Sequence, residues 1–110
     1  MMPAMEAKPT AAARAMPDPL TLLHAHEREL REHFHVRSLA LFGSAARGQA
    51  GPASDVDLLV EFDRPIGLLH LSATALRLEG LLARPVDLVL RRALRPELRA
   101  RVLAEAIDVF

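Results

Sequence analysis

The sequence predicts an α+β fold, in which helices back a small mixed sheet of three to four strands. Three short apolar runs, at residues 36–42, 55–62 and 86–90, have the length and apolar content of buried strands. Segments with apolar residues at helical spacing precede, separate and follow these runs. A helix between the second and third strands makes those two parallel neighbours, whereas the short link after the first strand suits an antiparallel pair.

The composition fits one globular domain. The chain has 110 residues, of which 51% are apolar, so it is too apolar to be disordered throughout. Its 14 basic and 14 acidic residues balance, and we therefore expect no strong nucleic-acid binding. It has no cysteine, which excludes disulfides and thiolate metal sites. No apolar run approaches ~18 residues and no secretory leader is apparent, so we expect a cytoplasmic location without a membrane span.

The N-terminal part is predicted to contain a tail and one helix. Residues 1–17 show little pattern and are interpreted as a flexible tail, so the single domain covers residues 18–110. Asp18 can cap a helix, and Pro19 is tolerated in a first turn. The spacing predicts a helix over 19–34, with one apolar face formed by Leu20, Leu23, Leu30 and Phe34.

The remaining helices follow from spacing and from glycine and proline positions. Gly43 ends the first strand, and only a short helix near residues 44–49 fits before the second. A helix is predicted over 67–83, with His70, Thr74 and Arg77 turned away from an apolar face of Leu68, Leu71, Ala75, Leu78 and Leu82. Pro96 begins a last helix, whose apolar side carries Leu98, Val102, Leu103, Ala106, Ile107 and Phe110.

This topology gathers five residues at one edge of the sheet. Asp55 and Asp57 open the second strand, and Asp87 lies at the start of the third. Parallel strands begin at the same edge, and an antiparallel first strand ends there, which adds Gly43 and Ser44. We therefore expect the three carboxylates and the Gly-Ser pair to form one site.

Three carboxylates at one edge indicate a cation. Asp55 and Asp57 are two residues apart on a strand and project from the same face. Two ionised carboxylates ~4 Å apart repel by roughly 4 kcal/mol at an effective dielectric of about 20. Oxygen ligands favour Mg²⁺ or Mn²⁺, and paired ions of this kind serve phosphoryl and nucleotidyl transfer. Asp55, Asp57 and Asp87 are thus the candidate catalytic metal ligands, whereas an Asp-x-Asp pair alone would be a weak signal.

The Gly-Ser pair favours a bound phosphate. Gly43 has no side chain to block a close approach of its backbone to a phosphate group. Ser44 lies at the start of the short helix, where free amides and a hydroxyl suit an anion, although it would also cap that helix. Arg47 lies one turn further on and can reach a phosphate oxygen, with a surface salt bridge as the alternative.

These motifs resemble a known family. Gly43-Ser44, ten intervening residues and Asp55-Val56-Asp57 match the signature of the DNA polymerase β-like nucleotidyltransferase superfamily. The run Gly43-Ser44-Ala45-Ala46-Arg47-Gly48, followed by Ser54-Asp55-Val56-Asp57-Leu58-Leu59-Val60, is similar to the minimal nucleotidyltransferase branch. Val86-Asp87-Leu88-Val89 matches the strand that holds the family's third metal carboxylate. The resemblance covers roughly residues 20–108 and implies a nucleotidyltransferase fold.

The resemblance implies a function beyond the bare chemistry. Members of this branch are commonly antitoxins that pair with a HEPN-domain toxin, a ribonuclease, and transfer AMP from ATP to a tyrosine of that toxin. The implied requirements are Mg²⁺ or Mn²⁺, ATP and a toxin partner, and therefore a hetero-oligomer. The chain has no tyrosine, so a tyrosine acceptor must lie on another molecule.

The same motifs also fit other functions. An antitoxin could neutralise its partner by binding alone, but binding does not require three aspartates. A nucleotidyltransferase for small molecules usually carries a further domain for its acceptor, and a metal-dependent glycosyltransferase with Asp-x-Asp is normally much larger.

Other charged residues have more ordinary interpretations. Glu61 shares a strand face with Asp57, but a sheet-surface glutamate is the simpler account, and the five histidines lack the spacing of a zinc site. An arginine-rich segment near the C terminus is interpreted mainly as a solvated helix face, with partner docking or contact with RNA or a triphosphate as alternatives. It contains Arg91, Arg92, Arg95, Arg99 and Arg101.

Overall fold

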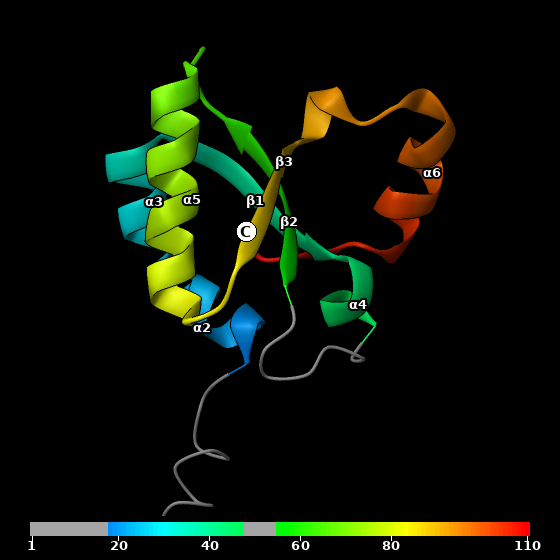
Figure 1. Ribbon diagram of the computed structural model, residues 1–110, viewed down its shortest axis with the longest axis horizontal. Helices are drawn as coiled ribbons and strands as arrows, with labels where there is room; N and C mark the ends of the chain where they lie inside the picture. The colour runs from blue at the N-terminus through cyan, green and yellow to red at the C-terminus, as the bar shows by residue number, and fades with distance from the viewer. Residues whose placement is uncertain (1–17, 48–54) are drawn as a thin grey trace, which may run out of the picture.

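The computed structural model describes residues 18–47 and 55–110, and in this part of the chain a four-stranded sheet lies between two sets of helices (Figure 1). The strand order is β3-β2-β1-β4. The predicted α+β fold with a mixed sheet is confirmed. The expected tail at residues 1–17 lies outside the described residues.

The three central strands lie where continuous apolar character predicted them. Strand β1 is Val36–Phe42, β2 is Val56–Phe62 and β3 is Val86–Leu90. β1 and β2 are antiparallel and β2 and β3 are parallel, as the connection lengths required. The crossover between β2 and β3 is helix α5, Leu68–Leu82, which also has its predicted position.

The fourth strand corrects the prediction for the C terminus. Helix α6 is Pro96–Glu105, and Ala106 has extended dihedral angles (φ −69°, ψ 144°), so the helix does not continue to Ile107. Strand β4, Ile107–Asp108, pairs with β1 instead. The backbone of the following Val109, which is buried, is hydrogen-bonded to Leu39. These pairings give hydrogen-bond partners to backbone groups on the free edge of β1. The need of an edge strand for such partners cannot be read from helical periodicity.

The predicted N-terminal helix is divided in two. Helix α2 is Pro19–Ala25, capped by the Asp18 side chain, and α3 is Glu27–Phe34. The imidazole Nδ1 of His26 lies 3.0 Å from the carbonyl oxygen of Leu22, to which it donates. That carbonyl is the acceptor that a continuous α-helix would offer to the His26 amide, which bonds to Leu23 instead. The side chain therefore accounts for the break.

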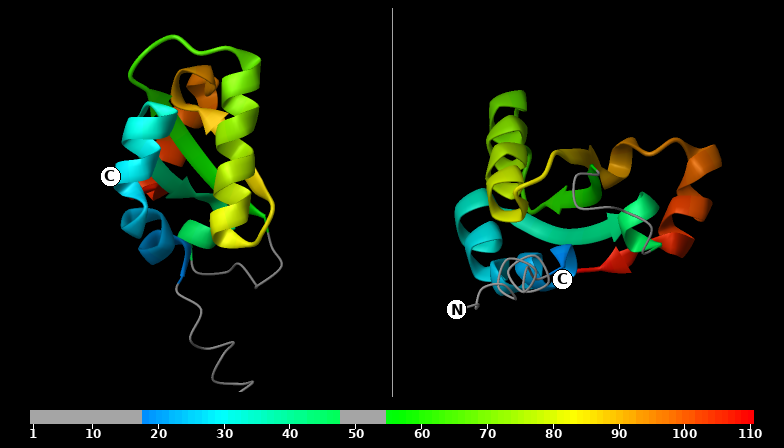
Figure 2. Two further views of the ribbon diagram at one scale, coloured as in Figure 1. Left: turned by 90° about the vertical axis from the view of Figure 1, so that its left-hand side faces the viewer. Right: turned by 60° about the horizontal axis from the view of Figure 1, so that its bottom comes forward.

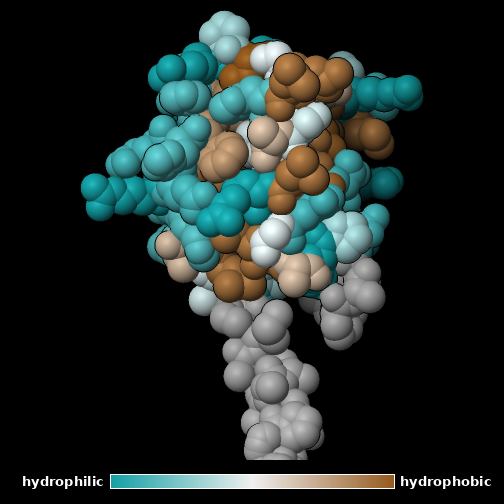
Figure 3. Space-filling view, turned by 60° about the vertical axis from the view of Figure 1, so that its left-hand side comes forward, coloured by the Kyte–Doolittle hydropathy of each residue, from teal (hydrophilic) through white to brown (hydrophobic). Residues whose placement is uncertain are grey.

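Helix α5 has the predicted ends but a different buried face. Leu78 and Leu82 are buried as expected, yet Thr74 is fully buried and Leu68 is 77% exposed. Thr74 can be buried because its hydroxyl donates to the carbonyl of His70 within the same helix, at 2.8 Å. The exposed leucines of α5 are Leu68, Leu69 and Leu76, and Figure 3 shows apolar side chains at the surface on this side of the molecule.

The main apolar core fills one side of the sheet, whereas Ala40 and Leu59 are buried on the other. Leu23, Leu30 and Leu78, from α2, α3 and α5, are fully buried against the strands. These helices cover that side, whereas η1 (Arg91–Ala93) and α6 follow on the other (Figures 1 and 2). α6 has no buried residue, and its Leu98 is 42% exposed. The second face of the sheet is thus more weakly covered. No helix of the described residues is long and apolar enough to cross a membrane.

Two leucines of α5 provide a test of this arrangement. Leu78→Ala should lower the free energy of unfolding by about 2–5 kcal/mol, because it removes a fully buried side chain from the core. Leu76→Ala, on the exposed side of the same helix, should change it by no more than about 0.5 kcal/mol. Chemical denaturation of both variants measures the difference, and equal losses would contradict the assigned core face.

Candidate active site

The pairing of β2 with β3 sets two aspartates side by side. Asp57 and Asp87 are register partners in the parallel ladder, near the start of each strand. Val56 and Leu58, which flank Asp57, belong to the apolar core, and Val86 and Leu88, which flank Asp87, pack against it. Because side chains alternate along a strand, Asp57 and Asp87 lie on the opposite, weakly covered face. Asp55 immediately precedes β2, and both Asp55 and Asp87 are exposed while Asp57 is half-buried.

The charges of Asp55 and Asp87 act on the carboxyl of Asp57. Burial raises the pKa of Asp57 above its ordinary value, and the charges of Asp87 and Asp55 raise it further. The guanidinium of Arg47 acts on this pKa in the opposite direction. Among the described residues, the charge of Arg47 thus opposes two anionic neighbours and the cost of burial. Such a cluster has the charge that a divalent cation would balance.

The donor set suits a hard cation, although its geometry is open. Asp55, Asp57 and Asp87 offer only carboxylate oxygens, which match Mg²⁺ or Mn²⁺ better than zinc. In residues 18–47 and 55–110, no three side chains of His, Asp or Glu close around one point tightly enough to hold a metal. Asp57 and Asp87 are adjacent in the sheet, but the three side chains do not surround a cation. Water or substrate oxygens would have to complete its coordination.

Gly43 packs closely against the Asp57 side chain, a contact that the sequence pattern does not predict. β1 ends beside the carboxylates, because Phe42 is the register partner of Asp57. Gly43 follows with φ +71°, which favours glycine, and a Cβ there would lie 3.1 Å from the Asp57 Cγ. The absence of a side chain therefore lets Asp57 pack against the backbone of Gly43. This requirement exists independently of any bound phosphate.

Ser44 and Arg47 are also brought to this edge of the sheet. Ser44 lies in α4, Gly43–Ala46, a single turn that directly follows β1. Arg47 comes next, and its Nη1 is 3.1 Å from the Glu105 Oε1 at the end of α6. The salt bridge expected as the alternative role of Arg47 thus exists, alongside its effect on Asp57. α4 ends at Ala46, and residues 48 and 49 of the helix predicted near 44–49 lie outside the described residues.

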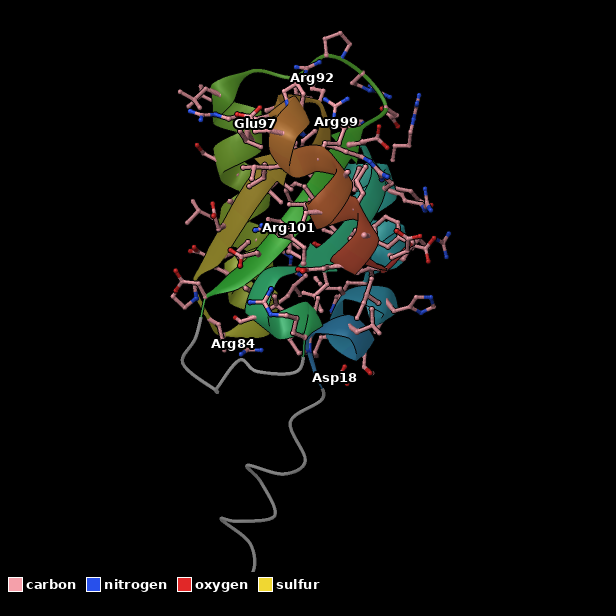
Figure 4. The ribbon with its side chains drawn as sticks, turned by 90° about the vertical axis from the view of Figure 1, so that its right-hand side faces the viewer. Asp18, Arg84, Arg92, Glu97, Arg99 and Arg101 are labelled. Atoms are coloured by element: carbon pink, nitrogen blue, oxygen red, sulfur yellow. The ribbon has the colours of Figure 1, made fainter. Side chains whose placement is uncertain are left out.

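Other charged side chains surround the carboxylate cluster or lie further away on the same face of the protein. Glu61 accepts a hydrogen bond from the Ser38 hydroxyl at 2.8 Å, which agrees with a role on the sheet surface. Glu105 was not identified, because its partner Arg47 is 58 positions away and local periodicity carries no such signal. Figure 4 shows Arg92, Arg99 and Arg101 spread over η1 and α6, together with Glu97.

A small cavity lies at the other end of β2 and β3. Its volume is about 150 Å³, and it is lined by Val60, Glu61, Phe62, Arg64, Ile66, Leu90 and Arg92. These residues belong to the carboxyl ends of the two parallel strands and the segments that follow them. Asp57 and Asp87 lie at the opposite ends of the same strands. The cavity is therefore separate from the carboxylate cluster.

Comparison with known proteins agrees with the fold. Residues 23–109 match the family model described as "Nucleotidyltransferase domain". This chain belongs to the nucleotidyltransferase domain family. Its sequence is 43% identical over 89 residues to the protein adenylyltransferase MntA of Thermococcus cleftensis, covering 81% of this chain and 90% of that protein.

Solved structures also resemble this nucleotidyltransferase domain. One assigned as a minimal nucleotidyltransferase superposes with a TM-score of 0.68 at 42% identity, covering 84% of this chain and 97% of the other. A toxin–antitoxin structure with AMP-PNP gives a TM-score of 0.66 at 22% identity, covering 79% of this chain and 72% of the other. The second similarity establishes a shared fold only, and the first extends the family relationship to the level of structure.

The contact between Gly43 and Asp57 provides a test within the nucleotidyltransferase domain. Gly43→Ala should lower the free energy of unfolding by at least about 1–2 kcal/mol, because an L-residue is strained at a left-handed φ. The new Cβ would in addition displace the Asp57 carboxylate. Gly80→Ala is the matched control in α5, where a Cβ meets nothing, and it should stabilise by about 0.5–1 kcal/mol. Urea denaturation measures both, and an unperturbed Gly43→Ala protein would contradict the geometry described.

The charge cluster predicts that Asp57→Asn stabilises the metal-free protein at neutral pH. A carboxyl whose pKa is raised by folding favours the folded state below its ordinary pKa, and this stabilisation is lost as the pH rises through the folded-state pKa. At pH 7 the ionised Asp57 therefore opposes folding, and asparagine removes that opposition. Thermal unfolding in EDTA should give a higher Tm for the variant.

Asp63→Asn is the control for that measurement. Asp63 follows β2 at its other end, and the hydrogen bond from Arg64 lowers the pKa of this carboxyl. Its substitution should leave the Tm unchanged or lower it. Added Mg²⁺ should raise the Tm of the wild type and of Asp63→Asn more than that of Asp57→Asn. A Tm for Asp57→Asn at or below that of the wild type would refute the electrostatic account.

Proposed function

We propose that this chain is a Mg²⁺-dependent protein adenylyltransferase that transfers AMP from ATP to a tyrosine of a HEPN-type toxin and acts as its antitoxin. The observation that carries the proposal is the side-by-side placement of Asp57 and Asp87, with Asp55 adjacent. The 43% identity to the protein adenylyltransferase MntA over most of both chains supports the same reaction class. Because ATP is the substrate, we place the reaction in the cytoplasm.

The proposed reaction breaks one phosphorus–oxygen bond of the α-phosphate and forms another. The oxygen of the acceptor hydroxyl attacks the α-phosphorus of ATP, and the bond from that phosphorus to the bridging oxygen of pyrophosphate breaks. The hydroxyl loses its proton, and pyrophosphate leaves with the electron pair of the broken bond. Bound Mg²⁺ would neutralise charge on the phosphates and lower the pKa of the attacking hydroxyl.

The residues at the sheet edge have distinct parts in this proposal. Asp55, Asp57 and Asp87 would hold the cation, and Asp57 is fixed in place because it packs on Gly43. Ser44 and the backbone at the start of α4 would face a phosphate, although one helical turn provides few free amides. Arg47 would contribute a positive charge beside the carboxylates.

The acceptor must be supplied by another molecule. The chain has no tyrosine, and its carboxylate edge lies on the weakly covered side of the sheet, with Asp55 and Asp87 exposed. Structures that share this fold at about one-fifth identity include the toxin–antitoxin MntA–HepT and a HEPN toxin that carries AMP groups in complex with its MNT antitoxin. By analogy, the partner of this chain would be a toxin of that type in a hetero-oligomer.

Transfer of label from ATP tests this function. The protein is incubated with ATP labelled at the α-phosphate, Mg²⁺ and a HEPN toxin of the same organism, and the toxin is examined for bound label by mass spectrometry. Label should appear on a toxin tyrosine with release of pyrophosphate. Asp57→Asn should reduce the initial rate by at least about 100-fold, as expected when a group that stabilises transition-state charge is lost.

Controls separate this reaction from inhibition by binding alone. Asp63→Asn, at the far end of β2, should transfer label at the wild-type rate. A toxin whose acceptor tyrosine is replaced by phenylalanine should still bind but remain unlabelled. Tight complex formation and loss of toxin activity without any label would instead establish a binding-only antitoxin. Label on a small molecule but not on the toxin would establish a different acceptor class.

A further inference from the structure

The last residue of α6 connects this helix to the carboxylate edge. Arg47 Nη1 and Glu105 Oε1 are 3.1 Å apart, and each side chain remains more than two-fifths exposed. An exposed pair of this kind contributes little to folding stability. Glu105 is also at the C-terminal end of a helix, where the helix dipole disfavours a negative charge. Stability alone therefore gives a poor account of a glutamate at this position.

Sheet pairing anchors the chain just after Glu105. Ile107 is the register partner of Leu41 in the antiparallel β1–β4 ladder. Glu105, two residues earlier, is the last residue of α6, and its side chain contacts Arg47, which follows α4. The backbone pairing of β4 with β1 therefore holds this end of α6 near Arg47.

Arg47 interacts with two sources of negative charge. It lowers the pKa of Asp57, which burial and the other aspartates raise. It is also in direct contact with Glu105. Without the charge of Glu105, the guanidinium would be attracted more strongly to the aspartates than to residue 105, and Arg47 would compete more with a cation for their oxygens.

We propose that Glu105 is a positioning residue that holds Arg47 at the rim of the carboxylate cluster, so that the aspartates stay available to a cation and the guanidinium faces the polyphosphate of the nucleotide. The proposal rests on the proposed nucleotidyl transfer and adds a residue to it. Glu105 itself does not touch the reacting atoms. Its effect reaches the nucleotide through Arg47.

The test compares two glutamates of α6 that differ in their arginine partner. Glu105→Gln removes the charge that faces Arg47, while Glu97→Gln removes the charge that lies 4.0 Å from Arg95 at the other end of the helix. Calorimetry in the presence of Mg²⁺ measures the Kd of AMP-PNP and of AMP for each protein, and thermal unfolding in EDTA confirms that both variants are folded.

The expected result is selective for the polyphosphate. Glu105→Gln should weaken AMP-PNP binding by about five- to tenfold, the size of one charge-assisted hydrogen bond. AMP, which lacks the β- and γ-phosphates, should bind Glu105→Gln and the wild type alike. Glu97→Gln should match the wild type for both ligands, and Glu105→Asp, which keeps the charge, should regain part of the loss.

A double-mutant cycle decides whether Glu105 acts through Arg47. In an Arg47→Ala background, Glu105→Gln should cause no further loss of AMP-PNP affinity. Equal losses with and without Arg47 would overturn the positioning role, as would wild-type AMP-PNP affinity in Glu105→Gln. A wild-type protein that binds no AMP-PNP would instead overturn the proposed function, so the two failures can be told apart.

Discussion

Parallel pairing between β2 and β3 is the constraint on which the rest of the molecule depends. The crossover helix α5 brings the starts of these strands to one edge and sets Asp57 directly beside Asp87. Their mutual repulsion opposes folding, and the strands stay together because Val56, Leu58 and Val60 are buried beneath the helices. The apolar face of each strand therefore offsets the electrostatic cost that its polar face creates.

One face of the sheet provides the apolar packing, and the other face carries the aspartates. On the core side, α2, α3 and α5 exclude water and provide the packing. On the other side, α6 has no buried residue, and the short β4 anchors the C-terminal segment through backbone pairing with β1. An open face leaves room for a nucleotide and a second protein, and the C-terminal segment can still place a charged group beside the site.

Much of the site could be predicted because its residues lie on elements with strong local signals. Continuous apolar runs predict β1, β2 and β3, and the rule for parallel crossovers predicts that Asp57 and Asp87 lie at the same edge of the sheet. The break at His26, the burial of Thr74 and the strand β4 could not be predicted, because each depends on a hydrogen bond that periodicity does not encode. The same limit concealed Glu105, whose partner is distant in sequence.

The role of Gly43 shows how a motif residue can satisfy two demands at once. Its positive φ and the close approach of Asp57 already require glycine in the absence of any ligand. In the proposed site, the turn that would expose the backbone to a phosphate is the same turn against which Asp57, a proposed cation ligand, packs. A substitution here would disturb the proposed metal ligand and the proposed phosphate contact together, so its effect on nucleotide affinity alone would not identify which was lost. Separating the two requires substitutions that leave this turn intact, and Glu105, which contacts Arg47 and lies outside the contact between Gly43 and Asp57, offers one.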